Sequence, residues 1–222
     1  MKRVLNLKEN ISIAAWLLLL LSEVSCSNHD RNKIAPMTTE SKTSTQAKRQ
    51  VGGPDPAENN GARWNADAAH AQITFSVKGP FGTVHGGFSD LRSTIKFDEN
   101  DLAHSSIVTS VDPKTINTGN KVRDNDLQKE TYLSSDQHPR ISFRSQKFEK
   151  EGNGYRVTGT LAIKETSKTV SIPFTFNQKG NSGTFKGQFS IQRMDYDVGN
   201  TGGLLKIGKE ITINLDVPVT KG

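Results

Sequence analysis

The chain has 222 residues, of which 33% are hydrophobic, with a formal net charge of +6 and a single cysteine. This length fits one domain with additional segments, and one cysteine excludes an intramolecular disulfide. Basic and acidic residues are interspersed without an arginine-rich strip or basic helix, so we expect no nucleic-acid partner.

Residues 1–25 have the pattern of a secretory signal peptide. Basic residues precede the apolar run ISIAAWLLLLL, which is too short to span a hydrocarbon core about 30 Å thick. Cys26 follows, and a lone cysteine there resembles the bacterial lipoprotein pattern, in which it becomes the lipidated first residue. Val24 and Ser25 fit this pattern, whereas Glu23 departs from it. We predict a lipoprotein-type signal; the alternative is ordinary cleavage, with Cys26 removed or left as a free thiol.

Residues 26–60 are rich in Ser, Thr, Asn, Lys, Gln and Pro. Their only large apolar residues are Ile34, Met37 and Val51, too few to bury a core. We predict a flexible polar linker that holds the folded domain, residues 61–222, away from a membrane.

From residue 71 onward, apolar and polar residues alternate. A period of two is typical of strands with one apolar face. The alternating runs are 71–77, 95–97, 107–111, 141–143, 157–163, 170–176, 185–191 and 211–217. Glycine- and asparagine-containing turns separate several of them. The spacing predicts an all-β fold, an antiparallel sandwich or barrel of about eight strands.

One stretch, TGNKVRDNDLQKETYLSSDQHPRISF, interrupts the alternation. Asn120 or Thr118 can cap a helix whose first turns carry Asp124 and Asp126. We therefore expect a short helical crossover over residues 122–130. The proline after His138 then returns the chain to extended structure.

Polar side chains near this crossover and after residue 192 are candidates for a head-group site. Arg123 and Asp124 could form a head-group or proton-transfer site. The alternative is a structural ion pair at the start of the helix. Arg193 and Asp195, in QRMDYDVG, suit a pair across a barrel mouth or an anionic head group.

His138 is a further mouth candidate. It is not spaced from the other histidines as metal ligands are, and no HxH or HxxxH pair occurs, so we expect no metal site. No nucleophile-elbow motif occurs either, and we expect no catalytic residue and no cofactor.

A closed sheet of eight strands has an interior wide enough for side chains or for one small ligand. Aromatic walls with gaps fit a cavity for a long apolar chain, but the same periodicity also fits a filled core. The glycines Gly86, Gly87, Gly159 and Gly187 lie within strands, where glycine marks a bend or a close approach. The candidate lining residues are Phe75, Val77, Phe88, Ile95, Phe97, Ile107, Phe143, Leu161, Ile163, Phe174, Phe176, Phe189 and Ile213.

Six stretches carry a family resemblance. In chain order they are WNADAAHAQITFSV, VHGGFSDLRSTIKFD, the segment from Thr118 to Phe148, YRVTGTLAIKETSKTVSIPFTF, FSIQRMDYDVGN and KEITINLDVPV. Together they span about residues 63–219, and they resemble the YceI-like family of bacterial periplasmic lipid- and polyisoprenoid-binding proteins. The resemblance implies an extended, lipocalin-like eight-stranded antiparallel barrel. It also implies a hydrophobic tunnel for an isoprenoid or fatty-chain lipid, with neither catalysis nor a metal.

We therefore expect carriage or storage of a long-chain amphiphile in the bacterial cell envelope, by an exported lipoprotein facing the periplasm. Two alternatives stay open. One is an enzyme that acts on an isoprenoid-like substrate through Asp124, Asp126 or His138. The other is an envelope stress or interaction module with a filled core. Whether the protein forms a homodimer also stays open.

Overall fold

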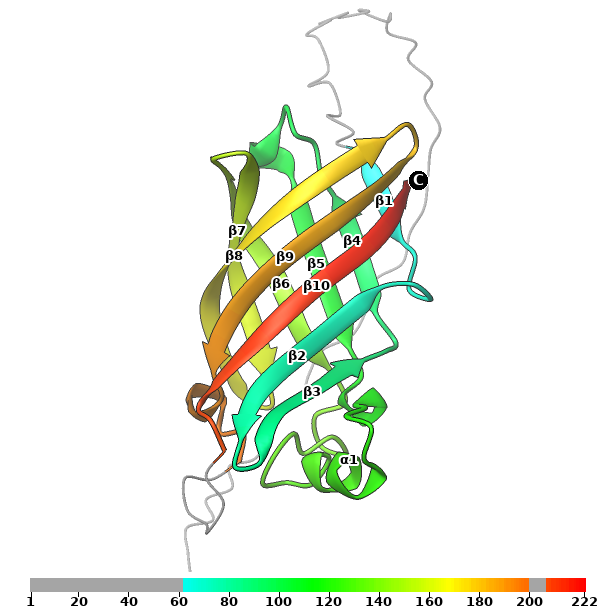
Figure 1. Ribbon diagram of the computed structural model, residues 1–222. Helices are drawn as coiled ribbons and strands as arrows, with labels where there is room; N and C mark the ends of the chain where they lie inside the picture. Colours follow the sequence, from blue (N-terminus) through cyan, green and yellow to red (C-terminus); the bar gives the residue numbers. More distant parts are fainter. Residues whose placement is uncertain (1–61, 200–206) are drawn as a thin grey trace, which may run out of the picture. The chain divides into compact units, whose positions relative to one another are not determined.

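A computed structural model describes residues 62–199 and 207–222, which form one antiparallel sheet (Figure 1). The predictions for residues 1–60 lie outside this part of the chain. The strands are β1 (Arg63–Ala66), β2 (Gln72–Gly79), β3 (Gly82–Phe88), β4 (Arg92–Lys96), β5 (Ser106–Val111), β6 (Ile141–Glu151), β7 (Gly154–Ile163), β8 (Thr166–Lys179), β9 (Ser182–Gln192) and β10 (Glu210–Lys221).

Eight of these strands close into a ring in the order β1-β4-β5-β6-β7-β8-β9-β10, because β1 pairs with both β4 and β10. Trp64 makes both connections, opposite Ile95 on one side and Lys221 on the other. The β2–β3 hairpin continues the sheet from the remaining length of β10. The predicted eight-stranded antiparallel barrel is confirmed.

Two strands were not found by alternation. Strand β1 has only four residues, too few to show a period. Strand β3 reads GTVHGGF, in which three glycines interrupt the apolar pattern. Hydrogen bonding to β2, rather than side-chain burial, makes β3 a strand, so the sequence pattern does not reveal it.

The helical crossover exists and is shorter than predicted. Helix α1 spans Lys121–Leu127, and the Asn120 side chain caps it by accepting hydrogen bonds from the backbone N–H groups of Val122 and Arg123. After Leu127 the backbone changes to turns, with hydrogen bonds from Lys129 N to Asp126 O and from Ser135 N to Gln128 O. These bonds replace the helical pattern and end the helix before residue 130.

In the described part of the chain, the outer edge of β3 has no neighbouring strand. A single bridge joins Gly87 to Asn117, with backbone N–O distances of 2.9 and 3.0 Å. The segment between η2 (Pro113–Thr115) and α1 therefore covers part of the outer edge of β3. This places α1 at the end of the barrel where β2 and β3 meet (Figure 1).

The opposite end of the barrel is filled by aromatic side chains. Phe97, 1% exposed, lies at their centre, with ring centroids 5.2 Å from Tyr155 and Phe176 and 5.9 Å from Phe148. Trp64 meets Phe176 edge-on at 5.0 Å and donates a hydrogen bond from Nε1 to the carbonyl oxygen of Phe97. We call these five residues the aromatic plug.

Candidate functional site

Between the aromatic plug and α1 the barrel encloses a cavity of about 830 Å³. This is within the usual range for small-molecule sites. Inward-facing apolar side chains from most of the strands line it. The barrel is therefore filled at one end and hollow at the other, which differs from both a packed core and a tunnel open at both ends.

Eleven of the thirteen predicted lining residues face this cavity. They are Phe75, Val77, Phe88, Ile95, Ile107, Phe143, Leu161, Ile163, Phe174, Phe189 and Ile213. Phe97 and Phe176 do not line it, which corrects their assignment. They point inward as predicted, but they lie further along the barrel in the plug, behind the rings of Phe174 and Phe185. A ligand-binding role for the eleven stays a prediction.

Several lining residues were missed because they lie outside the strands. Ile116, Leu127, Tyr132 and Leu133 come from the segment around α1 and line the end of the cavity. That segment has no period of two. Its apolar residues are scattered, so the sequence does not show which of their side chains face the barrel interior.

Gly86 shows how closely this wall is packed. A Cβ atom at Gly86 would lie 2.5 Å from the Phe75 ring and 2.9 Å from Cγ2 of Thr118. Because Gly86 has no side chain, the Phe75 ring can pack directly on β3. The segment before α1 can also lie close to the β2–β3 hairpin.

Arg123 and Asp124 are brought together through Thr118. The guanidinium of Arg123 donates from Nε to Thr118 Oγ1 (2.8 Å) and from an Nη to the Thr118 carbonyl (2.9 Å). Asp124 accepts from the backbone N–H of Thr118 (2.9 Å) and from its hydroxyl (2.5 Å). Asp126 instead pairs with Lys129 at 2.6 Å. Arg123 and Thr118 line the cavity, whereas Asp124 and Asp126 do not, so the acids hold the crossover rather than face a ligand.

Arg193 also lines the cavity, and its side chain is buried. It begins η3 (Arg193–Tyr196) and donates to the carbonyl oxygens of Gly208 (2.8 Å) and Val198 (2.7 Å). These bonds connect the segment after β9 to the start of β10. Asp195 is exposed, and its charge adds to burial in raising the pKa of the Tyr196 phenol.

His138 is half-buried and does not line the cavity; its backbone N–H donates to Ser134 O at 2.9 Å. Within residues 62–199 and 207–222, no three His, Cys, Asp or Glu side chains lie together as a metal site requires. No helix in this same part of the chain has the length and apolar character to cross a membrane.

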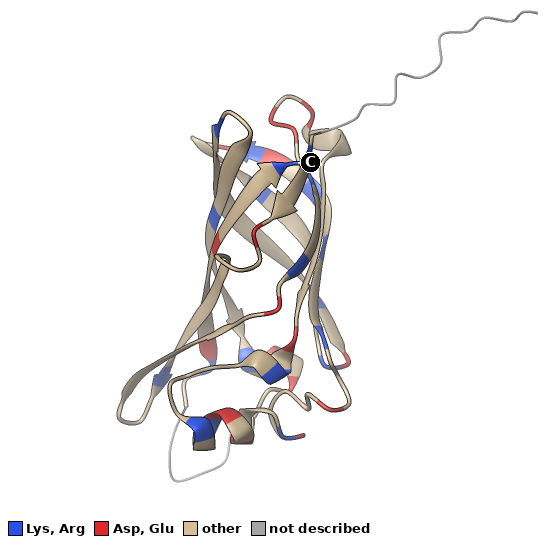
Figure 2. Ribbon diagram, turned by 90° about the vertical axis from the view of Figure 1, so that its right-hand side faces the viewer, with Lys and Arg blue, Asp and Glu red and all other residues tan. Residues whose placement is uncertain are grey.

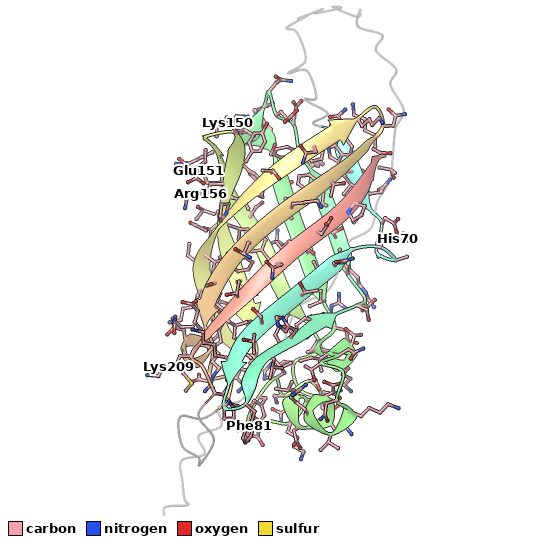
Figure 3. All side chains as sticks on the ribbon, viewed as in Figure 1. His70, Phe81, Lys150, Glu151, Arg156 and Lys209 are labelled. Atoms are coloured by element: carbon pink, nitrogen blue, oxygen red, sulfur yellow. The ribbon has the colours of Figure 1, made fainter. Side chains whose placement is uncertain are left out.

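The cavity opens at the α1 end. Phe81, at the tip of the β2–β3 hairpin, lines the cavity yet is 91% exposed, and Ile207 lines it while 39% exposed. Figure 3 shows Phe81 and Lys209 at this end and Lys150 at the other. Acidic and basic residues are interspersed along the ribbon (Figure 2).

A closed antiparallel barrel with an apolar cavity open at one end defines a lipocalin-like barrel. The chain belongs to the YceI-like family, whose domain model matches residues 64–219. This confirms the resemblance of the six stretches.

Among related sequences, a UPF0312 protein of Yersinia pestis (strain Pestoides F) is 25% identical over 158 residues, covering 68% of this chain and 81% of that protein. A solved structure, BcnA of Burkholderia cenocepacia, is 26% identical with a TM-score of 0.66, covering 70% of this chain and all of that one. A polyisoprenoid-binding domain from Saccharophagus degradans has a TM-score of 0.56 at 11% identity, covering 72% of this chain and 98% of that one. At that identity, the likeness shows the fold alone.

Proposed function

We propose that the protein binds a long-chain amphiphile of the polyisoprenoid or a related lipid class in the barrel cavity, as a carrier or store. The cavity itself carries this proposal: about 830 Å³, walled by apolar side chains, closed by the plug and open at the α1 end. A chain enters tail first, and its head group stays at the mouth near Arg123 and Arg193.

The energetics favour long chains over short ones. Each buried CH₂ group contributes roughly 0.8 kcal/mol, so a five-carbon unit gains only about 4 kcal/mol. Association costs at least about 4–15 kcal/mol in lost freedom. A chain of about twenty carbons gains on the order of 16 kcal/mol, which offsets that cost without any polar contact.

Binding is better supported than catalysis. Asp124 accepts hydrogen bonds from Thr118, Asp126 pairs with Lys129, and neither acid lines the cavity. His138 does not line it either. The three residues considered for acid–base chemistry therefore lie away from the place where a substrate chain would be.

A cavity-filling substitution tests the proposal. Ile213 lines the cavity, opposite Phe75 and Phe189 in the sheet, so Ile213→Trp fills the space while keeping or raising stability. The matched control is Thr212→Trp: Thr212 contacts Ser190 through its hydroxyl and does not line the cavity.

Native mass spectrometry of protein purified from its own host is the measurement. We expect a co-purifying lipid in the unsubstituted and Thr212→Trp proteins and its loss in Ile213→Trp. If the unsubstituted protein carries no lipid and binds no added prenyl lipid, the proposal is wrong.

We further propose that the protein is exported and held in the cell envelope by a lipid on Cys26. The support is the sequence pattern around that cysteine. Mass measurement of the mature protein identifies an attached lipid, and Cys26→Ala is expected to move the protein from the membrane to the soluble fraction. An unmodified thiol in the mature protein would contradict this.

A further inference from the structure

Apolar side chains are exposed around the mouth of the cavity. Of the four large hydrophobic residues exposed in the described part of the chain, three belong to the segments at this end: Phe81 (91%), Val122 (73%) and Ile207 (39%). Phe81 and Ile207 line the cavity, and Val122 precedes Arg123, which also lines it. We call these three residues the mouth rim. Exposed apolar groups continuous with a cavity mark an interaction site.

Three lysines lie close to the mouth-rim residues in the sequence. Lys78 is the last residue but one of β2, and Lys121 begins α1 beside Val122. Lys209 lies two residues after Ile207, and the backbone N–H of Gly208 between them donates to Lys78 O at 2.7 Å. All three lysines are exposed, and none pairs with an acidic side chain among residues 62–199 and 207–222. Other exposed lysines, such as Lys129 and Lys186, do pair with carboxylates.

We propose that the mouth rim docks on a phospholipid bilayer containing anionic lipid, and that the ligand passes directly between bilayer and cavity. The inference rests on the proposed function, because a chain of this class is held in bilayers. A long chain that crosses water exposes every CH₂ group to the solvent. When the cavity mouth docks on the bilayer, the chain moves from one apolar environment to another without this exposure. Phe81 at the hairpin tip can insert into the membrane interface. The three lysines can bind the head groups of anionic lipids. Glu210, beside Lys209, lowers the positive charge, so the expected dependence on anionic lipid is modest.

Site-specific fluorescence tests this orientation in the full chain. With Cys26→Ser as background, Phe81→Cys carries a polarity-sensitive thiol dye, and Asn153→Cys carries the same dye at the other end. Asn153 is an exposed turn residue two positions after Glu151, which lies far from Phe81 in Figure 3. The proteins are mixed with vesicles of phosphatidylcholine and phosphatidylglycerol, or of phosphatidylcholine alone.

We expect a blue shift and quenching by spin-labelled lipid at position 81 and no change at position 153, with a smaller response without phosphatidylglycerol. No response at 81, or an equal response at both positions, overturns the proposal. This readout does not depend on how the N-terminal region meets the membrane.

A second measurement uses Val122→Asp. An acidic residue is favourable in the first turn of a helix, so α1 is retained. Val122 does not line the cavity, so the amount of prenyl lipid bound at equilibrium stays unchanged. Transfer of a fluorescent prenyl lipid from vesicles slows about tenfold, which corresponds to ~1.4 kcal/mol; an unchanged rate contradicts docking by this surface.

The two proposals fail in different ways. If prenyl lipid binds while the dye at position 81 stays in water, the docking surface is wrong and the binding function stands. If the dye enters the bilayer while no prenyl lipid binds, the docking surface stands and the proposed function is wrong.

Discussion

The aromatic plug makes a quantitative prediction about stability. In Phe97→Ala, the ring at the centre of the plug is removed from a position that is 1% exposed. Five aromatic rings surround Phe97 at centroid distances of 5.2–5.9 Å. They come from four strands, β6 to β9, and cannot all move into the space, so a void remains and its lining loses contacts.

The expected cost follows from that void. Buried Phe→Ala substitutions reduce the free energy of unfolding by about 3–5 kcal/mol. Four of the five ring pairs are edge-to-face, an arrangement that adds to area burial, so we expect the upper half of this range. For a domain of this size each kcal/mol lowers Tm by roughly 2–4 °C, so a loss of about 4–5 kcal/mol gives a decrease of about 8–20 °C. Urea unfolding and a thermal melt followed by circular dichroism measure both quantities.

Two matched substitutions separate the plug from the rest of the barrel. Phe189→Ala removes the same atoms from a wall that already faces the cavity, where the ring has fewer partners, so its cost is lower. Phe81→Ala removes an exposed ring and changes the free energy of unfolding by less than about 0.5 kcal/mol. The reasoning is refuted if Phe97→Ala costs below about 1 kcal/mol, or no more than Phe189→Ala.

Two further predictions concern close packing and ionisation. In Gly159→Ala the new Cβ would overlap the Arg144 carbonyl and lie 2.6 Å from the Phe143 ring. We expect the free energy of unfolding, measured with urea, to fall by about 1–3 kcal/mol. Gly187→Ala, where the nearest neighbour of the new Cβ is 3.0 Å away, should lower it less. Burial and the hydrogen bond to Glu99 raise the pKa of Tyr155 above its usual value, so the unfolded chain loses this proton first as pH rises beyond about 10. The free energy of unfolding should therefore fall between pH 9 and 11 less steeply in Tyr155→Phe than in the unsubstituted protein, and equal slopes would contradict this assignment.

Much of the barrel could be predicted because a strand with one buried face leaves a period of two in the sequence. The alternating runs gave the inward face of their strands, and ten of the eleven lining residues lie in those runs; Phe88, in β3, does not. The turn residues and strand spacing gave the antiparallel class. The polar segment before β6 was correctly separated as the helical crossover, since Asn120 caps the helix and apolar alternation stops there.

The sequence pattern did not give positions along the barrel. Phe174 and Phe176 lie two residues apart on the same inward face, yet Phe174 lines the cavity and Phe176 belongs to the plug. Their places depend on strand tilt and on which side chains meet from other strands. The hydrogen bonds from Thr118 to Asp124 and from Arg123 to Thr118 likewise depend on the folded arrangement and could not be read from the sequence. The sequence by itself therefore determined which side chains of the alternating strands point inward. Only the tertiary structure decided where the interior is filled and where it is hollow, because that depends on how rings distant in sequence pack against one another.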